Sequence, residues 1–209
     1  MNIYEYGDKS AQLVLLEPIG EHSRDYMERE VSFIRENVAA DFRLIAFEVG
    51  DWNKDLSPWE APAVFGDENF GDGASDTLAE ILKYCEDADK TYILGGYSLA
   101  GLFALWAAHQ SDVFKGIAAV SPSMWFLGFD TFMREHEIKS GTVYLSLGTK
   151  EEKARNRVMA TVGDRMRDAY AFLQDKNINC TLEWNEGNHF RDPDIRTAKG
   201  FSWVCKQLA

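Results

Sequence analysis

Cysteine is scarce in this 209-residue sequence, and its three copies, Cys85, Cys180 and Cys205, lie far apart. An odd number of isolated cysteines favours buried, reduced thiols over a disulfide framework, and it supplies no cluster of metal ligands. The first ten residues also lack the basic patch and apolar core that mark a signal peptide. We therefore expect a cytoplasmic protein with no disulfide bond and no cysteine metal site.

Basic residues are also in the minority. The 22 lysines and arginines stand against 34 aspartates and glutamates, which gives a net charge of −12. This charge argues against a nucleic-acid partner and against binding to an acidic membrane surface. The most apolar stretch, residues 99–108, is too short to span a bilayer. We expect a soluble protein, and a length of 209 residues fits one domain over residues 1–209.

Apolar runs that are typical of buried strands alternate along the chain with segments of helical periodicity. Strands are expected at residues 11–17, 42–49, 92–94, 116–120, 142–147 and 179–184, and helices at 27–38, 75–85, 102–108, 131–137, 154–174 and 194–205. Ser75 or Asp76 is expected to cap the second helix, and Asp194 the last. The alternation predicts a mostly parallel central sheet with helices on both faces.

The long segment at residues 50–73 is rich in tryptophan, proline, glycine and aspartate and shows no periodicity. A loop of that length inside a compact domain is usually functional or covers a site. In a parallel sheet, ligands bind at the carboxyl ends of the strands, so residues that follow strands are the first candidates for chemistry.

The segment at residues 91–110 predicts a nucleophile elbow, with an apolar strand, a tight turn at Ser98 and a buried helix. Gly96 and Ser98 fit the Gly-x-Ser-x-Gly pattern, whereas Ala100 replaces the last glycine. Small residues are needed because strand and helix nearly touch, and the turn exposes the serine hydroxyl. The following helix directs its N-terminal N–H groups at an anion beside the serine. Ordinary glycine-rich turns share such patterns, so the partners of Ser98 must decide the assignment.

Only four histidines are available to activate Ser98. His109 lies at the far end of the helix that follows the serine, and His136 lies in a charged run. His22 follows the first long strand, close to an expected helix start. His189 lies in a loop that leaves the last strand at its carboxyl end, where a base is expected in such a sheet. We predict that His189 is the base rather than an ordinary histidine of a surface loop.

The acid that orients His189 is expected between the serine and the histidine in the sequence. The strand at residues 142–147 leads directly to Glu151 and Glu152, which places two carboxylates just beyond the strand end. Glu151 is the first choice and Glu152 the reserve. Two adjacent glutamates beside lysines also occur at ordinary charged helix starts, and this alternative stays open.

Stabilisation of an oxyanion requires backbone N–H groups near Ser98. The N–H of Leu99, directly after the serine, is the first expected donor. A second is expected from the loop after the first long strand, with Ile19 as the working candidate and Gly20 left open.

Aromatic residues are concentrated near the expected mouth of the site. Trp59 lies in the long loop, and Trp125 follows the strand at residues 116–120. We predict that Trp125 and Trp59 line a substrate pocket. The alternative for each is that it seals the core beneath an irregular loop.

Residues 96–105 and 121–126 together resemble the putative esterase family of α/β hydrolases, which includes enterochelin and salmochelin esterases, S-formylglutathione hydrolase and mycolyltransferases. Residues 55–58 (DLSP) resemble the Asp-Leu-Thr-Pro segment of that family. Residues 148–151 and 187–189 resemble its acid and base positions. The resemblance implies a compact α/β-hydrolase fold and serine-dependent ester hydrolysis or acyl transfer without a metal or cofactor.

These observations predict a serine esterase that cleaves a small-molecule carboxylic ester through Ser98, His189 and Glu151 and an acyl-enzyme. Three alternatives stay open: acyl transfer to an acceptor other than water, thioester hydrolysis, and a catalytically silent hydrolase fold that serves for binding. The first two use the same triad, and the third predicts an unreactive Ser98. The sequence does not specify the natural substrate or the oligomeric state.

Overall fold

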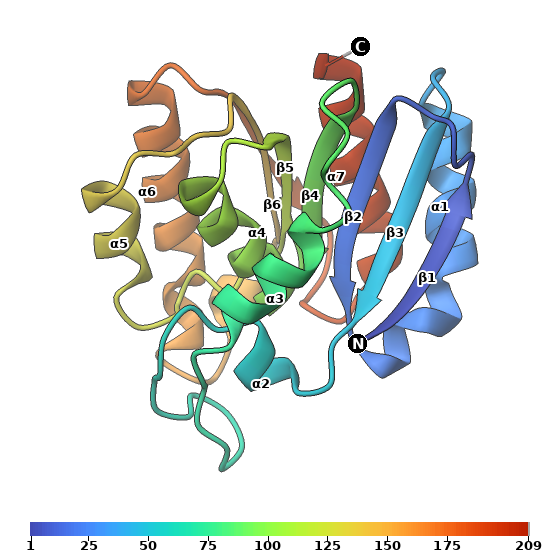
Figure 1. The fold of residues 1–209 in the computed structure, drawn as a ribbon. Coiled ribbons are helices and arrows are strands. Elements are labelled where there is room, and N and C mark those ends of the chain that lie inside the picture. Colours follow the sequence, from blue (N-terminus) through green and yellow to red (C-terminus); the bar gives the residue numbers. More distant parts are fainter. Residues whose placement is uncertain (209) are drawn as a thin grey trace.

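A seven-stranded, mostly parallel sheet forms the centre of residues 1–208, the part of the chain that the computed structural model describes. The strand order is β1-β3-β2-β4-β5-β6-β7, and only β1 runs antiparallel to its neighbour (Figure 1). The strands are β1 (Asn2–Gly7), β2 (Leu13–Ile19), β3 (Phe42–Glu48), β4 (Thr91–Tyr97), β5 (Phe114–Val120), β6 (Thr142–Gly148) and β7 (Asn179–Asn185). The predicted α/β architecture is therefore confirmed.

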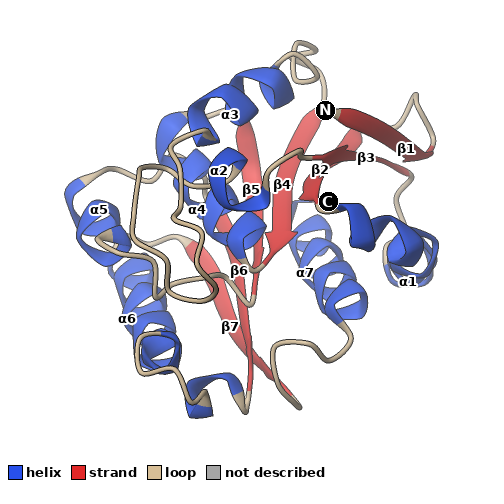
Figure 2. Ribbon diagram, turned by 90° about the horizontal axis from the view of Figure 1, so that it is seen from below, coloured by secondary structure: helices blue, strands red, loops and turns tan. Residues whose placement is uncertain are grey.

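Helices cover both faces of the sheet, as Figure 2 shows in a view toward the carboxyl ends of the parallel strands. One face carries α1 (Met27–Asn37) and α7 (Pro193–Leu208). The other face carries α3 (Ala74–Leu82), α4 (Leu99–Gln110), α5 (Phe129–Glu135) and α6 (Val162–Asp175). Residues 1–208 also contain four short helices: η1 (Glu21–Tyr26), α2 (Trp52–Asp55), η2 (Glu151–Lys153) and η3 (Met159–Thr161). None of the helices within residues 1–208 is long and apolar enough to cross a membrane.

Burial is most complete in β2, β6 and α4, which explains their continuous apolar sequences. Every residue of β2 and β6 is buried, because helices cover these strands from both sides. Helix α4 is buried from Leu99 to His109, where it packs on β4 and β5. Close packing also needs Gly95, since a Cβ there would lie 2.7 Å from the Phe201 ring of α7. The segment around Ser98 is thus fixed by the core of the protein.

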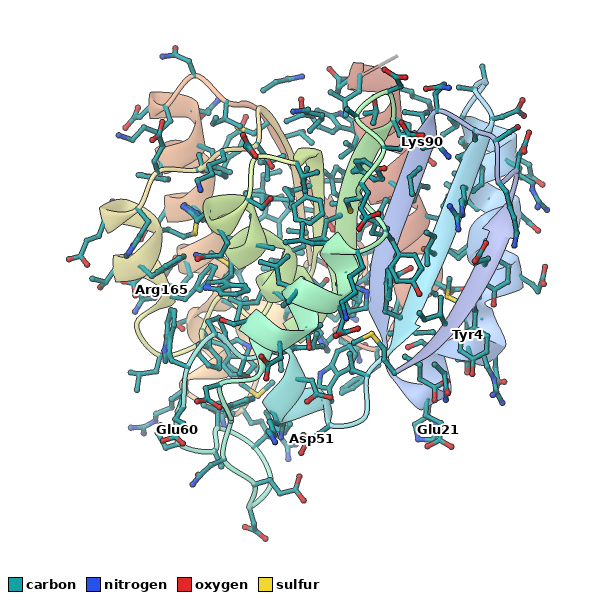
Figure 3. The ribbon with its side chains drawn as sticks, in the orientation of Figure 1. Tyr4, Glu21, Asp51, Glu60, Lys90 and Arg165 are labelled. Carbon is teal, nitrogen blue, oxygen red and sulfur yellow. The ribbon has the colours of Figure 1, made fainter. Side chains whose placement is uncertain are left out.

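Strand β1 is an element that the sequence analysis did not predict. It pairs only with β3 at the edge of the sheet, and its side chains alternate between partly buried and exposed. In Figure 3 the labelled Tyr4 lies on this outer strand, and its hydroxyl donates to Glu48 Oε2 at 2.8 Å. A short edge strand with tyrosines on one face lacks the continuous apolar run that identifies the inner strands.

Several predicted boundaries are wrong. Strand β2 continues through Pro18, which lies beyond the last β4 partner, where a strand with one neighbour tolerates proline. The helix expected from residue 154 begins only at Val162, and Val158 lies outside it and is exposed. Helix α3 begins after Gly73, so neither Ser75 nor Asp76 is its N-cap. Asp194 is the second residue of α7 rather than its cap.

Local hydrogen bonds hold the long segment between β3 and α3, residues 49–73, in a defined conformation. Asp51 caps α2 by accepting from the Lys54 N–H at 3.0 Å, and the Asp55 carbonyl accepts from Thr77 Oγ1 at 2.7 Å. A bridge between Ala61 and Phe70 closes the outer part of the segment. The segment therefore has a defined path along the carboxyl ends of the parallel strands, where the candidate site lies.

Candidate active site

Ser98 stands between β4 and α4 in a backbone conformation that serine rarely adopts. Its φ is 59° and its ψ is −119°, values that cost energy in a residue with a Cβ. A Cβ on Gly96 would lie only 2.6 Å from the Cβ of Ala100, so this tight turn requires glycine at position 96. Glycine at position 96 thus makes the room that alanine at position 100 takes up. The sequence departs from the usual glycine pattern without opening the turn.

Backbone hydrogen bonds hold the strained serine in place. The Ser98 N–H donates to the Val120 carbonyl at 3.0 Å. The Ser98 carbonyl accepts from the N–H groups of Leu102 and Ser123, each at 3.1 Å. The backbone of Ser98 is therefore held by bonds to three neighbouring segments rather than by the turn alone.

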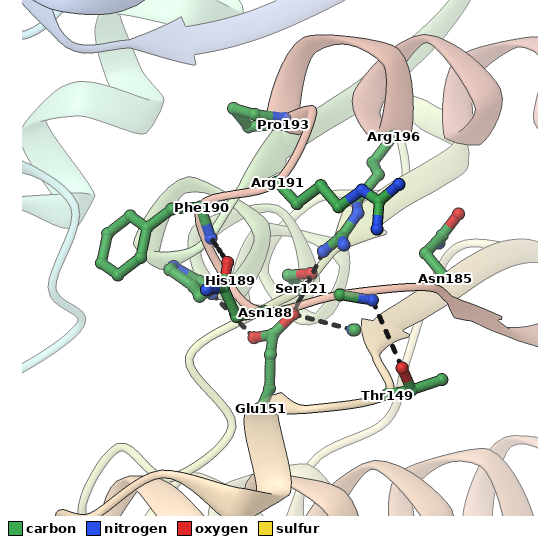
Figure 4. Close-up of polar contacts among 12 residues, drawn as sticks. Ser121, Thr149, Glu151, Asn185, Asn188, His189, Phe190, Arg191, Pro193 and Arg196 are labelled. Carbon is green, nitrogen blue, oxygen red and sulfur yellow. Dashed lines mark hydrogen bonds and ion pairs between the residues drawn. The ribbon is translucent and has the colours of Figure 1, made fainter.

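His189 lies within hydrogen-bond distance of both Ser98 and Glu151. Its Nδ1 is 2.7 Å from Glu151 Oε2, as Figure 4 shows, and its Nε2 is 3.0 Å from Ser98 Oγ. The Tyr97 hydroxyl donates to the His189 carbonyl at 2.7 Å, which ties the histidine loop to the end of β4. The structure brings together the three residues that the sequence analysis singled out.

Glu151 is buried and surrounded by hydrogen-bond donors. Besides His189, it faces Ser121 Oγ at 2.8 Å, the Gly148 N–H at 2.8 Å and Arg196 Nη1 at 3.4 Å, all at Oε1. Glu152, the reserve acid, instead pairs with Arg167 Nη2 at 2.8 Å. Of the two adjacent glutamates, only Glu151 contacts the histidine.

The sequence analysis missed the polar residues that surround Glu151. Arg196, from α7, is buried and binds the Tyr97 hydroxyl at 3.2 Å and the Glu186 carbonyl at 2.9 Å, as well as Glu151. Burial raises the pKa of Tyr97, which keeps its hydroxyl a neutral donor. An arginine on the apolar face of the last helix was the available signal for a buried ion pair, because arginine is rarely buried without a partner. Ser121 offered no such signal.

The other three histidines lie apart from this group. His109 is buried at the end of α4, where burial lowers its pKa to about 4. His136 stacks on Phe132 at a ring-centroid distance of 4.3 Å, and His22 is exposed on η1. None of the hydrogen bonds of residues 1–208 joins these histidines to Ser98.

The candidate oxyanion donors lie at the carboxyl edge of the sheet. Leu99 is the first residue of α4, so its N–H belongs to the first turn, where a helix has unpaired donors. Ile19 is the last residue of β2, and its carbonyl accepts from the Val49 N–H at 3.0 Å. Gly20 follows it as the residue that precedes η1. The choice between the Ile19 and Gly20 N–H groups stays a prediction.

Two cavities flank Trp125. The first, which we call the histidine-side cavity, has a volume of about 300 Å³. It is lined by Ser121, Pro122, Trp125, Lys150, Glu151, Lys153, Ala154, Met159, Val162, Asn188, His189 and Phe190. The second, the loop-side cavity, has a volume of about 260 Å³ and lies under the segment at residues 61–64, beside Phe70 and Leu127. Trp125 lines both cavities, and its role in a substrate pocket stays a prediction.

Trp59 lines neither cavity. Its indole N–H donates to the Leu127 carbonyl at 2.9 Å, and its ring packs against Phe126, Phe129 and Phe132. The structure therefore places Trp59 as a packing residue beneath the loop, which was the alternative considered for it. Within residues 1–208, no group of three or more histidine, cysteine or acidic side chains is arranged to hold a metal ion.

Comparisons with known proteins identify the family of this chain and proteins of similar structure. Residues 22–189 match the family model described as "Putative esterase". A siderophore hydrolase, EstA from Aspergillus nidulans, is 19% identical with a TM-score of 0.70, over 100% of this chain and 95% of that one. The enterobactin esterase FES from Shigella flexneri is 14% identical with a TM-score of 0.66, over 99% of this chain but only 56% of that one.

A third similar structure is an alpha-beta serine hydrolase homologue from Coxiella burnetii, 12% identical with a TM-score of 0.57, over 99% of this chain and 91% of that one. A search of curated proteins found no match. Identities this low show a shared fold, whereas the family model covers most of the chain. The protein belongs to the Putative esterase family and is a carboxylic ester hydrolase with the α/β-hydrolase fold.

Proposed function

We propose that the protein hydrolyses a small-molecule carboxylic ester through a triad of Ser98, His189 and Glu151 and an acyl-enzyme intermediate. The observation that carries the proposal is the continuous chain of short contacts from Glu151 through His189 to Ser98, at 2.7 and 3.0 Å. A serine hydroxyl needs such a base to become a nucleophile, and the base needs an orienting partner.

The first half of the reaction forms the acyl-enzyme. His189 Nε2 accepts the Ser98 proton as Oγ attacks the ester carbonyl carbon. Glu151 holds Nδ1 and stabilises the imidazolium that results. As the tetrahedral intermediate collapses, the bond to the alcohol oxygen breaks, and the imidazolium returns its proton to that oxygen.

The second half releases the acid. Water enters where the alcohol has left, and His189 takes one of its protons while the oxygen attacks the acyl carbon. The Ser98–acyl bond then breaks and Ser98 recovers its proton. In both halves the Leu99 N–H and the N–H of Ile19 or Gly20 are the proposed donors to the oxyanion, and the positive end of the α4 dipole supports them.

Trp125 is the proposed wall of the substrate pocket, because it lines the histidine-side cavity together with Glu151 and His189 and also lines the loop-side cavity. Trp59 is left out of this role on account of its packing against the phenylalanines of the core. If the pocket assignment holds, Trp125→Ala changes the dependence of kcat/KM on ester chain length. Unchanged kinetics across a series of 4-nitrophenyl esters would remove the role.

The experiment for the proposed function is stopped-flow hydrolysis of 4-nitrophenyl acetate. Wild type is expected to turn over the ester. If deacylation is slower than acylation, it also releases a burst of 4-nitrophenol that is stoichiometric with enzyme and accumulates an acetylated serine that acid quench traps. Ser98→Ala should show none of these. Ser123→Ala is the matched control, since Ser123 Oγ lies 3.4 Å from Ser98 Oγ and is not bonded to His189. Turnover that survives Ser98→Ala would refute the proposal.

Two further expectations from the sequence remain proposals. Residues 1–209 form a single domain, which predicts one cooperative unfolding transition by calorimetry. A cytoplasmic location is tested by fractionation of cells that produce the protein at its native level.

A further inference from the structure

The histidine-side cavity combines apolar walls with two lysines at its edge. Trp125, Met159 and Val162 supply apolar surface, and Lys150 and Lys153 complete the lining. An apolar pocket with a few polar groups is the usual form of a small-molecule site, in which the polar groups fix orientation and specificity. The charge of these groups therefore indicates the chemistry of the molecule that the cavity accepts.

The backbone presents the two lysines together. Lys150 directly precedes η2 and Lys153 is its last residue, so the two are three residues apart in a 3-10 turn, where residues at that spacing lie on the same side. The two glutamates between them point elsewhere, since Glu151 is bound to His189 and Arg196, and Glu152 to Arg167. No ion pair among residues 1–208 includes Lys150 or Lys153. Their positive charges are exposed beside the cavity and are not neutralised by a neighbouring carboxylate.

This local charge is opposite to that of the whole protein. The chain has a net charge of −12, yet the segment at residues 150–157 holds Lys150, Lys153, Arg155 and Arg157 against two glutamates. An acidic protein repels anions at long range. Cationic side chains at the edge of one cleft make the electrostatic potential positive there, which attracts anions. The lysines therefore favour an anionic group at this cavity over a neutral one.

The position of the catalytic base indicates which part of the ester lies in the cavity. His189 lines it together with Asn188 and Phe190. In the proposed mechanism, His189 Nε2 must reach the oxygen of the departing alcohol to protonate it. The alcohol portion thus lies on the histidine side of Ser98. Phe190, 84% exposed beside the histidine, offers further apolar surface at the mouth.

We propose that the histidine-side cavity binds the alcohol portion of the substrate, and that this alcohol has an apolar body and an anionic group that pairs with Lys150 and Lys153. The inference rests on the proposed esterase function and adds the substrate class. The loop-side cavity, which shares Trp125 with the histidine-side cavity, is left for the acyl group.

The test compares two esters that differ in the charge of the alcohol: 4-acetoxybenzoate, which is anionic at pH 7.5, and its neutral methyl ester. Each kcat/KM is divided by the rate of alkaline hydrolysis of the same ester, which removes the difference in leaving-group reactivity. At low ionic strength we expect wild type to favour the anion about five- to tenfold. Lys150→Gln/Lys153→Gln should bring the ratio close to one, and 0.5 M salt should reduce it in wild type.

Lys115→Gln/Lys206→Gln is the matched control. It removes the same two charges at exposed positions, and Lys115 lies at the amino end of β5, opposite the site. The control should keep the wild-type ratio. A ratio near one in wild type, or equal losses in the two double variants, would overturn the proposal. A preference for a negative charge on the acyl side, measured with 4-nitrophenyl hemisuccinate against 4-nitrophenyl butyrate, would overturn the assignment of the cavity to the alcohol.

Binding separates this proposal from the proposed function. Titration of 4-acetoxybenzoate into Ser98→Ala measures the cavity without turnover, and the added lysine substitutions should weaken binding by about the same factor as kcat/KM. Charge-selective binding in a protein with no esterase activity would refute the catalytic proposal and keep the anion site. Esterase activity with charge-indifferent binding would refute the anion site alone.

Discussion

Two groups of buried glutamates in this protein have opposite surroundings. Glu151 is met by the histidine, a serine hydroxyl, a backbone N–H and a buried arginine. Glu17 of β2 and Glu30 of α1 are equally buried, yet one oxygen of each has no hydrogen-bond partner among the described residues. Burial raises the pKa of Glu17 to about 7, and burial with the adjacent Glu17 charge raises that of Glu30 well above its usual value.

The comparison shows that donors, rather than depth, decide what a buried carboxylate can do. A carboxylate with several fixed donors can orient a histidine and stabilise its charged form. Two carboxyl groups that face each other without a cation are stable only when they share a proton. Arg29, on the same helix as Glu30, binds Asp192 and Asp194 instead. The first arrangement suits catalysis, and the second makes stability depend on pH.

Glu151→Gln should give the largest effect, because an amide cannot stabilise an imidazolium and can hold the wrong histidine tautomer. We expect kcat to fall about 10³- to 10⁴-fold, in line with acid-to-amide changes in other triads. Steady-state kinetics on 4-nitrophenyl acetate measure the loss. Glu152→Gln, which alters only the contact with Arg167, is the control and should stay within about twofold of wild type. Similar losses in both variants would remove the distinction between the two glutamates.

Arg196→Met tests whether the donors around Glu151 matter to the chemistry. It removes the cation from a buried pair while it keeps the apolar bulk of the side chain, so we expect kcat to fall about 10- to 100-fold and stability to fall by about 3 kcal/mol. Active-site titration corrects for unfolded protein. Arg196→Lys should recover part of kcat if charge near Glu151 is what matters. A loss of stability with an unchanged kcat per folded molecule would limit Arg196 to a structural role.

Glu17→Gln tests the other half of the comparison. A carboxyl whose pKa rises on folding stabilises the folded state less as pH increases, from its unfolded pKa near 4.5 to its folded pKa near 7. The substitution should therefore stabilise the protein by about 1–3 kcal/mol at pH 8 and give little difference at pH 4.5. Urea unfolding at the two pH values measures this, with the exposed Glu36→Gln as the control. A destabilised variant at pH 8 would mean that the Glu17 charge is compensated.

Ser121→Ala should give the smallest effect. It removes one of the donors to Glu151 Oε1, while Gly148 and Arg196 still hold that oxygen. Loss of one hydrogen bond among several corresponds to about a three- to tenfold decrease in kcat. A decrease as large as that of Glu151→Gln would show that the serine hydroxyl, and not the group of donors, positions the acid.

Local patterns in the sequence predicted the positions of Ser98 and His189, because each depends on residues that are close to it in the chain. The Gly96–Ser98 turn is built by neighbours in the chain, and the loop of His189 follows directly from the end of a recognisable strand. The choice between Glu151 and Glu152 was harder, because both follow the same strand. The choice depends on which glutamate side chain the 3-10 turn directs toward the His189 loop. Arg196 of α7 binds Glu151 and Arg167 of α6 binds Glu152, so contacts from two different helices fix the two side chains.

The residues that the sequence did not reveal act across long chain separations. Ser121, directly after β5, and Arg196, in α7, contact Glu151, and the periodicity of these two elements predicts only burial. The packing role of Trp59 depends on phenylalanines of α5, which no local pattern connects to the long loop. Pairing of β1 with β3 likewise depends on tertiary contacts rather than on an apolar run.

The central claim is that His189 and Glu151 activate Ser98, and intact-mass analysis after treatment with a fluorophosphonate tests it most directly. Wild type and the Ser123→Ala control should each gain one adduct, whereas Ser98→Ala should gain none and His189→Ala should react far more slowly. No adduct on folded wild type, or an adduct that persists in Ser98→Ala, would contradict the account.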